Sequence, residues 1–546
     1  MLICGLLLVG ILFLSRSLGQ ILEESNQKRY ARSVVNMDDL LKMEDDLALN
    51  LEKYAIRLFQ KAKTIKLGIH QMKERHQRYE ASSKFGISPF DTYSLIRHMQ
   101  ADWLMWQVFM EEAVGLEELA YLELKKSSLP KKYDMFDAAY GIKRMQTTYE
   151  MSASDIANGL LDGVQYNSSL GSVDCLAMAH HLINQSRWTL AEQWILAGIE
   201  AKGPQTELQL LRGPNKAYLY RILSQVRMQH GNHEGALQAF RIALKHSPHD
   251  SKTFQEYQSL EKNTFTFPGN KVEESKNSDD SVDTDDSEGK MQLPTCCSGR
   301  CEVPRELKKL YCVFNHETAP FLRLAPIKTE ILSIDPFVII LHEMVSPKES
   351  ALIRSISKPY LLPSTTVDVD DTLDIYNIAT FRTSKSVWYQ NDFNEATLKI
   401  TERLGDATGL DLNYSEAFQA INYGLAGFFQ SHYDMLHSDM NRHNGTDDRV
   451  ATTLFYLNEV PQGGATYFPG LNITVFPKFG SALFWYNLDM KGNDQLWTLH
   501  TGCPVIVGSK WVVSKWVYYK GQEFRRPCIE SNSSAKQFWS IEKLII

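Results

Sequence analysis

The chain has 546 residues and a formal net charge of −7, and its hydrophobic and charged fractions of 43% and 23% are ordinary for a globular protein. At roughly 150 residues per domain, this length predicts about three or four folding units. The acidic balance and the lack of a long basic patch argue against nucleic-acid binding, so we expect no nucleic-acid partner.

An apolar run at the N-terminus, residues 2–14, is followed by the small residues Ser17 and Gly19. This pattern predicts a secretory signal peptide over residues 1–19, although no lysine or arginine precedes the run. A signal anchor is the alternative, but the run is short for a membrane span. No other segment could cross a bilayer, so we expect a luminal or secreted chain with no transmembrane span after signal cleavage.

Glycosylation sequons and cysteines agree with a luminal address. Six Asn-x-Ser/Thr sequons occur, at Asn167, Asn184, Asn413, Asn444, Asn472 and Asn532. Cys503 and Cys528 flank the C-terminal strand, and four cysteines form a cluster at Cys296, Cys297, Cys301 and Cys312. We expect disulfides between Cys503 and Cys528 and between Cys312 and one of Cys296 or Cys297; zinc binding by the cluster is the alternative. The C-terminal residues 543–546 are not a retention signal for the endoplasmic reticulum, so retention there would need a partner.

Residues 20–150 are predicted to form a helical dimerisation region. Between residues 36 and 76, apolar side chains recur largely at alternating steps of three and four, interrupted by Lys61. Such a seam is typical of a coiled coil between two chains, or of one helix in an internal bundle. Ser88-Pro89 begins a second helical stretch, which ends at Leu129-Pro130. Nothing in this region has the pattern of a chemical site.

Residues 172–262 show paired helices. The clearer pair contains Gly231 to Ala236, then Phe240, Ala243-Leu244 and Pro248, which is the tetratricopeptide pattern. A looser match covers residues 174–184 and 188–201. We expect a small tetratricopeptide-like domain whose groove binds a peptide substrate; a spacer is the alternative.

The composition changes abruptly over residues 263–295, an acidic, serine-rich run that predicts a flexible linker. Calcium binding by its aspartates is the alternative. Short strands separated by Gly and Pro turns follow, at 337–341, 454–457, 473–476, 482–486 and 511–519. They predict a double-sheet jelly roll, a double-stranded β-helix, over residues 296–546. The expected fold class is therefore multidomain α + β.

The strand-rich region carries a candidate metal site. Two imidazoles and a carboxylate, from His432, Asp434 and His500, match the facial triad of non-haem Fe(II) oxygenases, which leaves positions for O2 and a co-substrate. Because residues i and i+2 of a strand point to the same side, we expect His432 and Asp434 on one strand and His500 on a neighbour. A buried Lys510 would fix a carboxylate of the co-substrate. By itself the His-x-Asp pair also fits a surface turn.

The sequence around these residues resembles one family, the alpha subunits of collagen-type prolyl 4-hydroxylase. The resemblance covers nearly the whole chain in order, from signal peptide to catalytic domain. Its most specific blocks are Asn422-Tyr423-Gly424, His432-Tyr433-Asp434, Gly463-Gly464-Ala465-Thr466, Phe484-Trp485-Tyr486-Asn487, His500, Cys503-Pro504-Val505, Gly508-Ser509-Lys510-Trp511 and Gly521-Gln522-Glu523-Phe524-Arg525-Arg526-Pro527-Cys528.

The resemblance implies a procollagen-proline 4-dioxygenase, which uses Fe(II), 2-oxoglutarate and O2 to convert peptidyl-proline to 4-hydroxyproline, with succinate and CO2 as by-products and L-ascorbate to rescue oxidised iron. His432, Asp434 and His500 match the iron ligands. Lys510 matches the lysine that pairs with the distal carboxylate of 2-oxoglutarate, and Tyr423 matches a tyrosine of the same pocket.

The resemblance also implies an assembly and an address. Family members form an alpha2beta2 tetramer with protein disulfide isomerase as the beta subunit, and the isomerase would supply the retention signal for the endoplasmic reticulum lumen. Self-association would use the N-terminal helices. The same resemblance supports the Cys503–Cys528 pair, approximates a second pair by Cys297 and Cys312, and leaves Cys301 as an extra cysteine.

Two departures from the family pattern stand out. Tyr518 replaces a histidine that follows the lysine by eight residues; it shares a face with Lys510 if the strand is unbroken, so it should still line the co-substrate site. A phenol cannot become cationic, which predicts lower coupling or altered 2-oxoglutarate affinity.

The second departure lies in the peptide domain, where the stretch 222–228 lacks the family's tyrosine stripe, and Tyr218 and Tyr220 lie one turn earlier. We therefore expect weak binding of proline-rich peptides by this domain.

Two other functions remain open from the sequence. One is a 2-oxoglutarate oxygenase with a non-collagen or non-proline peptide substrate. The other is a non-catalytic paralogue that binds a peptide or a partner; the retained triad and Lys510 argue against it.

Overall fold

The computed structural model describes residues 29–81, 89–201, 203, 206–265, 296–301, 311–366, 377–378, 382–436 and 448–526. The predicted signal peptide, nearly all of the acidic linker, Cys528 and the sequons at Asn444 and Asn532 lie outside these residues. The chain divides into two compact units, one of residues 36–131 and one of residues 132–546 together with the segment that ends at Val35. Within the described ranges, no helix is long and apolar enough to cross a membrane.

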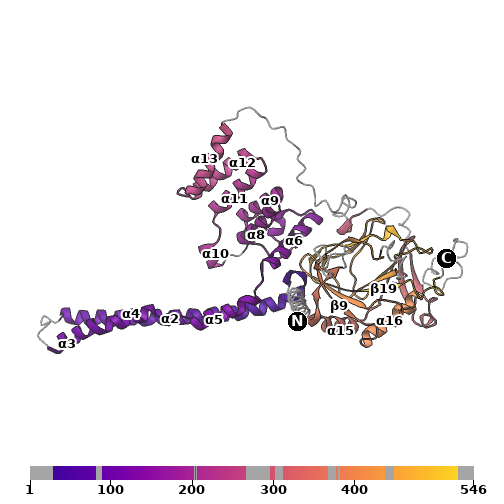
Figure 1. Ribbon diagram of the computed structural model, residues 1–546, viewed down its shortest axis with the longest axis horizontal. Helices are drawn as coiled ribbons and strands as arrows, with labels where there is room; N and C mark the ends of the chain where they lie inside the picture. Colours follow the sequence, from indigo (N-terminus) through magenta and orange to yellow (C-terminus); the bar gives the residue numbers. More distant parts are fainter. Residues whose placement is uncertain are drawn as a thin grey trace, which may run out of the picture. The chain divides into compact units, whose positions relative to one another are not determined.

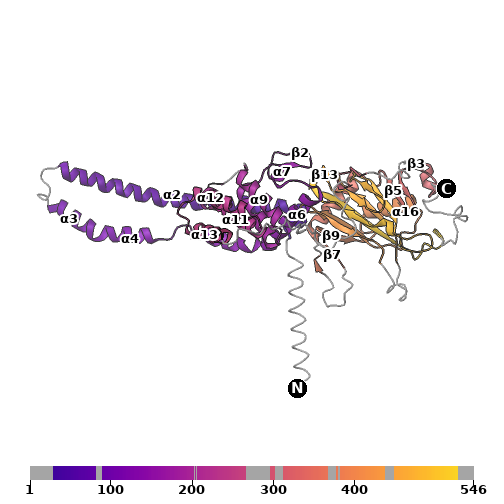
Figure 2. The ribbon, with the colours of Figure 1, turned by 90° about the horizontal axis from the view of Figure 1, so that it is seen from above.

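The unit of residues 36–131 is a helical hairpin. Helix α2 (Met37–Ala81) runs out, and α3 (Pro89–Arg97), η3 (His98–Asp102), α4 (Trp103–Glu111) and α5 (Leu116–Lys125) return along it (Figure 2). Contacts fix the antiparallel register, because Arg57 binds Glu118 while Gly68 faces Trp106. A Cβ on Gly68 would lie 2.3 Å from the Trp106 ring, so only glycine allows this approach. The seam of α2 thus packs in part within the chain, as the internal-bundle alternative predicts.

The helical part of the other unit begins with α6 (Lys132–Thr148) and α7 (Ala153–Ala157) and the short strands β1 (Leu160–Leu161) and β2 (Val164–Gln165). Helices α8 (Ser172–Asn184), α9 (Trp188–Glu200), α10 (Glu207–Arg212), α11 (Lys216–Gln229), α12 (His233–His246) and α13 (Ser251–Phe265) follow, and Figure 1 shows them stacked. The predicted helix pairs are confirmed as α8 with α9 and α11 with α12. On α12, Ala236 and Phe240 are fully buried, and the small side chain of Ala236 allows a close approach to α11.

The C-terminal part is built from antiparallel strands, as predicted. The larger sheet contains, among the described residues and in spatial order, β3 (Tyr311–Asn315), β4 (Ile327–Ile334), β5 (Phe337–Leu341), β16 (Ala482–Tyr486), β12 (Arg449–Tyr456), β19 (Lys510–Tyr518), β10 (Phe418–Tyr423), β9 (Ser384–Tyr389) and β6 (Leu362–Pro363). A smaller sheet has the order β11 (Phe429–His432), β17 (His500–Gly502), β14 (Thr466–Phe468) and β15 (Ile473–Val475). Two-stranded ribbons pair β13 (Gln462–Gly463) with β18 (Val505–Val507) and β7 (Thr365–Thr366) with β8 (Asn377–Ile378). Two facing antiparallel sheets are consistent with a jelly roll.

The larger sheet has an outer face covered by helices and an inner face directed at the smaller sheet. Helices α15 (Pro347–Ser357) and α16 (Glu395–Thr408) lie along the outside (Figure 1). On β19 the alternate residues Trp511, Val513 and Val517 belong to the core shared with these helices, whereas Val512 belongs to the core between the sheets. β19 is continuous from Lys510 to Tyr518, so every even-numbered residue faces the interior between the sheets.

The disulfide predictions are wrong where the structure tests them. Cys503 pairs with Cys297, and Cys296 pairs with Cys301, which is therefore not an extra cysteine. After the linker the chain returns to the smaller sheet, where Thr474 on β15 donates a hydrogen bond of 2.9 Å to the carbonyl of Cys296. Cys296 and Cys297 therefore lie at the sheet that also contains β17, the strand directly before Cys503. Cys312 lies exposed on the edge strand β3 with a free thiol. The disulfides also leave no cluster of free thiols for zinc.

Candidate active site

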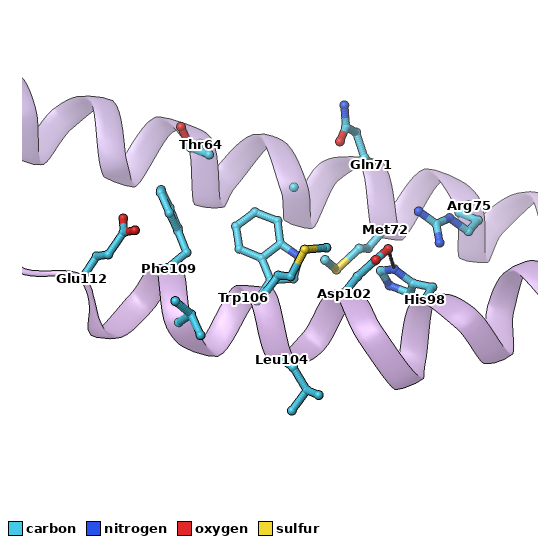
Figure 3. A pocket seen from close by; sticks show the side chains of 13 residues that line it. Thr64, Gln71, Met72, Arg75, His98, Asp102, Leu104, Trp106, Phe109 and Glu112 are labelled. Atoms are coloured by element: carbon cyan, nitrogen blue, oxygen red, sulfur yellow. Dashed lines mark hydrogen bonds and ion pairs between the residues drawn. The ribbon is translucent and has the colours of Figure 1, made fainter.

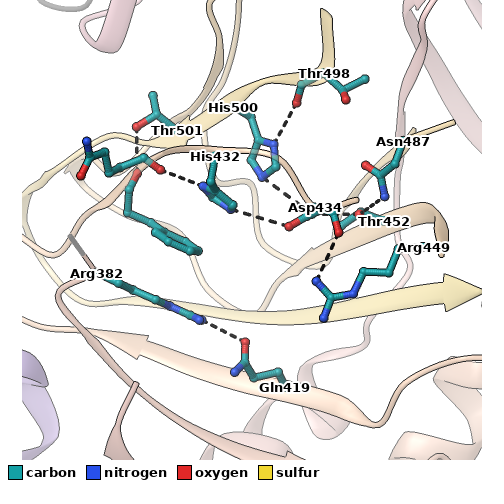
Figure 4. Close-up of polar contacts among 12 residues, drawn as sticks. Arg382, Gln419, His432, Asp434, Arg449, Thr452, Asn487, Thr498, His500 and Thr501 are labelled. Atoms are coloured by element: carbon teal, nitrogen blue, oxygen red, sulfur yellow. Dashed lines mark hydrogen bonds and ion pairs between the residues drawn. The ribbon is translucent and has the colours of Figure 1, made fainter. Parts of the chain in front are cut away.

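Three side chains that the sequence singled out meet at the β11 edge of the smaller sheet. His432 on β11 pairs directly opposite His500 on β17, and Asp434 joins them from the turn that follows β11 (Figure 4). One ligand atom from each of the three lies within 4.8 Å of the other two. The His432 Nε2–Asp434 Oδ1 and His500 Nε2–Asp434 Oδ2 distances are 3.7 and 3.8 Å. This spacing leaves room for one ion between them.

Of the His-x-Asp pair, only the histidine lies on a strand, whereas both residues were expected there. His432 is the last residue of β11, and Asp434 lies beyond the end of the strand. Strand alternation therefore does not place the carboxylate. Instead, β12 holds it: Thr452 Oγ1 donates to Asp434 Oδ2 at 2.8 Å, and Arg449 Nη1 donates to the Asp434 carbonyl at 3.2 Å. Asn487 Nδ2 in turn donates to Thr452 Oγ1 at 2.9 Å.

Backbone carbonyls orient both imidazoles. His432 Nδ1 lies 2.7 Å from the carbonyl oxygen of Gln430, and His500 Nδ1 lies 3.0 Å from that of Thr498. A carbonyl only accepts, so each Nδ1 carries the proton and each Nε2 lone pair points toward Asp434. Metal-binding histidines are commonly oriented in this way by a hydrogen bond to their second nitrogen.

Electrostatics favour a neutral His432 imidazole beside an ionised Asp434 carboxylate. Burial, together with the neighbouring His500, lowers the pKa of His432 to about 3. Burial alone would raise the pKa of Asp434, but His500, His432 and Arg449 hold it below its ordinary value. Two neutral nitrogens and one carboxylate are a donor set that suits Fe(II), so the residues present fit an iron ion.

Lys510 and Tyr423 lie on the inner face of the larger sheet, which is directed at the sheet that carries the two histidines. They are opposite each other in the register of β19 and β10, and Lys510 Nζ lies 5.1 Å from the centre of the Tyr423 ring. Lys510 is 2% exposed, and among the described residues no carboxylate forms an ion pair with it. Burial lowers its pKa to about 7. A buried amine without a protein counter-charge is suited to an anionic ligand.

The inner face of β19 also carries Trp516 and Tyr518. Arg449 stacks over the Trp516 ring at 4.4 Å and forms an ion pair with Glu416. Because β19 runs unbroken from Lys510 to Tyr518, Tyr518 lies an even number of residues from Lys510 on the same strand, opposite Arg449 at a register shift in β12.

Sequence reasoning missed a buried arginine at the site. Arg382 lies over the Phe429 ring at 4.6 Å, and Phe429 stacks on His432 with ring centres 3.7 Å apart. Its Nη2 donates to Gln419 Oε1 at 2.9 Å, while its Nε is buried without a hydrogen-bond partner among the described residues (Figure 4). Burial lowers the pKa of Arg382, against the opposite influence of Tyr423 and Asp434. No motif marked this residue, whereas Asn487 ends the block Phe484-Trp485-Tyr486-Asn487.

Comparisons with known proteins agree with this geometry. A family model described as the N-terminal region of the prolyl 4-hydroxylase alpha-subunit matches residues 33–163, and one for the 2OG-Fe(II) oxygenase superfamily matches residues 418–518. Prolyl 4-hydroxylase subunit alpha-1 of Mus musculus is 30% identical over 517 residues, which is 91% of this chain and 95% of that protein. The chain belongs to the prolyl 4-hydroxylase alpha-subunit family.

Other members of the prolyl 4-hydroxylase alpha-subunit family match at similar length. Subunit alpha-2 of Caenorhabditis elegans is 29% identical over 517 residues, 91% of this chain and 92% of that protein. A solved structure of viral collagen prolyl hydroxylase from Paramecium Bursaria Chlorella virus-1, a 2OG complex, is 23% identical and covers 33% of this chain and 95% of its own, with a TM-score too low, at 0.27, to support an argument. The matched oxygenase region contains His432, Asp434, His500, Lys510 and Tyr423.

Proposed function

We propose that this chain is the catalytic alpha subunit of a procollagen-proline 4-dioxygenase, which hydroxylates peptidyl-proline with Fe(II), 2-oxoglutarate and O2. The observation that carries the proposal is an oriented His432–Asp434–His500 cluster at the smaller sheet, together with a buried Lys510 on the inner face of the larger sheet that has no ion pair among the described residues. Family membership over almost the whole chain supports proline as the substrate residue.

Each residue has a distinct task in this reaction. The Nε2 atoms of His432 and His500 and a carboxylate oxygen of Asp434 would hold iron, and Thr452 fixes the orientation of that carboxylate. When bound, iron with 2-oxoglutarate and O2 supplies the oxidation that turns a proline C4–H into C4–OH and 2-oxoglutarate into succinate and CO2. Lys510 would bind the distal carboxylate of 2-oxoglutarate, so that the co-substrate enters in one orientation. L-ascorbate would restore iron oxidised in cycles without substrate.

The decisive experiment measures 2-oxoglutarate decarboxylation with and without a Pro-Pro-Gly peptide. We expect the peptide to stimulate CO2 release and to gain 4-hydroxyproline in equal amount. Decarboxylation that the peptide does not stimulate would favour a different peptide substrate, and no decarboxylation with iron and ascorbate present would favour a non-catalytic role. Asp434→Ala should remove both signals, which controls for contaminating activity.

Peptide binding is assigned to the helices α8 to α12, which we interpret as a tetratricopeptide-like domain. Extended proline-rich peptides dock on exposed aromatic rings, and Tyr218 on α11 is 39% exposed. Tyr220 instead stacks on His246, with ring centres 6.0 Å apart. The residues Ile222, Leu223 and Val226, which stand where the family has its tyrosine stripe, are buried in the core. One exposed tyrosine in place of a stripe supports the expectation of weak binding.

Replacing Tyr218 with Ala in the full-length chain tests this assignment. The KM for a long Pro-Pro-Gly polymer should rise several-fold, while the KM for a single short peptide should stay unchanged. Tyr220→Phe is the matched control, since it keeps the stacked ring. Equal KM values in the wild type and Tyr218→Ala would refute the assignment, and tight polyproline binding by the wild type would refute the expected weakness.

The helical hairpin is the proposed surface for self-association. Only Gly68 of the 45 residues of α2 is buried, and α4 exposes large apolar side chains such as Trp103, Met105 and Val108. A groove of about 710 Å³ between the two arms is lined by Met72, Trp106 and Phe109 (Figure 3). A second copy of the hairpin would cover these side chains. Met105→Glu with Val108→Glu should halve the mass of the assembly measured by light scattering; an unchanged mass would refute the proposal.

Assembly with protein disulfide isomerase would complete an alpha2beta2 tetramer and retain it in the endoplasmic reticulum lumen. The support is family membership together with the glycosylation sequons. Expression with and without the isomerase, followed by endoglycosidase H digestion, tests both statements: retained subunits should keep sensitive glycans, and secretion of the isomerase-bound subunit would refute them.

A further inference from the structure

A short segment that precedes the hairpin in sequence is buried against strand β10 and the loop that follows it. Residues Tyr30, Ala31, Arg32 and Ser33 are 4%, 6%, 4% and 0% exposed, and we refer to them as the strap. The first three form the short helix η1 (Tyr30–Arg32). Burial of this degree close to the N-terminus is unusual, because terminal segments are poorly ordered unless contacts hold them.

One end of the strap is held by α6. The amide of Tyr30 donates to Asp134 Oδ1 at 2.9 Å, and Arg32 Nε donates to Asp137 Oδ2 at 2.9 Å. The second of these is an ion pair in which Arg32 is 4% and Asp137 10% exposed. Arg29 Nη1 also donates to Asp137 Oδ2, at 3.4 Å, so two arginines hold this segment against the nearly buried carboxylate.

The middle of the strap lies against the loop between β10 and β11. The amide of Leu425 donates to the Ala31 carbonyl at 2.8 Å, and Arg32 Nη1 donates to the carbonyl of Arg382 at 3.3 Å. A Cβ on Gly424 would lie 2.1 Å from the Ala31 carbonyl oxygen, so a glycine is required for the strap to approach so closely. Gly424 directly follows Tyr423, and Arg382 is the buried arginine of the site.

The far end of the strap reaches the strand of Lys510 through one amide. Ser33 Oγ donates to Asn422 Oδ1 at 2.6 Å, and both residues are fully buried. Asn422 Nδ2 donates to Ser509 Oγ at 2.9 Å and to the Lys510 carbonyl at 3.3 Å. Ser33 Oγ itself accepts from the amide of Val35 at 3.3 Å, so its proton remains available for Asn422.

This arrangement fixes the direction of the Asn422 amide. The oxygen must face Ser33 because Ser33 donates, and the nitrogen must face Lys510 because a carbonyl only accepts. Without the Ser33 hydroxyl, Asn422 Oδ1 is a buried acceptor without a donor. Rotation of the amide by half a turn would satisfy that oxygen at Ser509 but would remove the donor from the Lys510 carbonyl. The backbone that carries the co-substrate lysine thus depends on a residue 477 positions earlier in the sequence.

We propose that Ser33 is a positioning residue for the co-substrate pocket, acting through Asn422 on Lys510 and Tyr423. This inference rests on the proposed function, in which Lys510 binds the distal carboxylate of 2-oxoglutarate. It makes the N-terminal strap a part of the catalytic domain, although more than two hundred residues separate the two in sequence. A protein that begins after the acidic linker would lack the strap.

The test compares Ser33→Ala with the wild type in the full-length chain. Anaerobic titration calorimetry with 2-oxoglutarate should give a Kd about tenfold higher for Ser33→Ala, since the Lys510 backbone is then no longer fixed through Asn422. The KM for the peptide should not change. Ser33→Thr keeps the hydroxyl and should restore the Kd to within about threefold of the wild type.

Ser350→Ala is the matched control, because Ser350 is also fully buried and donates a hydrogen bond of 2.6 Å to the carbonyl of Leu457 on the outer side of the sheet. It should lower the melting temperature without a change in the Kd for 2-oxoglutarate. If Ser33→Ala behaves in the same way, the strap only stabilises the fold and the proposal is wrong.

Lys510→Met is measured in the same experiment, so that failure of this proposal can be distinguished from failure of the proposed function. If Lys510→Met weakens 2-oxoglutarate binding and Ser33→Ala does not, the strap proposal alone fails. If neither variant weakens binding, the assignment of the pocket fails. In the wild type, hydrogen exchange gives a measurement that needs no variant: 2-oxoglutarate should slow exchange of the segment 29–35, and unchanged exchange there would overturn the proposal.

Discussion

Strand β19 carries two buried lysines whose replacement should have opposite effects on stability. Lys510 faces the site and Lys515 faces the helices, and burial lowers the pKa of each to about 7. Lys515 donates to Asn391 Oδ1 and to the carbonyl of Glu416. Lys510 has no such hydrogen bond and no ion pair among the described residues. Lys515 is therefore held by neighbouring acceptors, whereas Lys510 is a buried amine without a counter-charge among the described residues.

The sign and size of the effect follow from the proton equilibrium. The pKa of Lys510 is lower in the folded state than the ordinary value of 10.5, so the unfolded chain binds the extra proton between pH 7 and 10.5. Stability should therefore rise with pH across that window, and the full cost is present below pH 7. At about 1.4 kcal/mol per pKa unit, burying this amine costs roughly 3–5 kcal/mol at pH 7. Lys510→Met removes the cost, and Lys515→Met leaves two buried acceptors without a donor.

The assay is thermal unfolding followed by tryptophan fluorescence, from pH 6 to pH 10, with and without 2-oxoglutarate. Lys510→Met should melt higher than the wild type at pH 7, and the gap should narrow toward pH 10. Lys515→Met should melt lower than the wild type. 2-Oxoglutarate should stabilise the wild type and Lys515→Met but not Lys510→Met. A Lys510→Met variant that melts lower at pH 7 and still responds to 2-oxoglutarate would refute the reasoning.

Three further predictions concern the metal, the departure from the family pattern and the cross-links. Asp434→Ala should lower iron affinity by about 100-fold or more, measured as metal retained after dialysis; full retention would exclude Asp434 as a ligand. Tyr518→His should change the ratio of succinate to hydroxyproline or the KM for 2-oxoglutarate, and identical kinetics would show that the phenol replaces imidazole without consequence. Cys297→Ser combined with Cys503→Ser should cost roughly 2–5 kcal/mol of stability, seen as a lower melting temperature, whereas an equal loss in Cys312→Ser would contradict the pairing.

Local patterns predicted the elements of this fold because periodicity is a local property. The small residues around Phe240 located the α11–α12 pair, and the apolar run at 337–341 became β5 with the same bounds. The even-numbered face of β19 was also predictable, since a continuous strand alternates whatever its neighbours are.

Contacts made over long sequence distances were not predictable in this way. The position of Asp434 depends on Thr452 and Arg449 of β12, so the strand argument placed it on β11, which ends two residues earlier. The partner of Cys503 depends on where the chain returns after the linker, and nearness in sequence pointed to the wrong cysteine. No periodic signal could have connected Ser33 to Asn422, because neither residue belongs to a motif with the other.

The buried polar groups of this protein are of two kinds. Structural groups have hydrogen-bond partners within the protein, and functional groups lack such partners or a counter-charge among the described residues. Thr452, Asn422 and Lys515 are buried and bonded to neighbours, and each fixes a piece of backbone or a side chain. Among the described residues, the Nε2 atoms of the two histidines face the Asp434 carboxylate without accepting a hydrogen bond, and the buried Lys510 Nζ has no ion pair. Such groups lower the stability of the unliganded protein. A metal ion would satisfy the histidines, and a dicarboxylate would neutralise Lys510. The bonded groups hold the functional ones in place: Thr452 fixes the Asp434 carboxylate, and Asn422 donates to the carbonyl of Lys510.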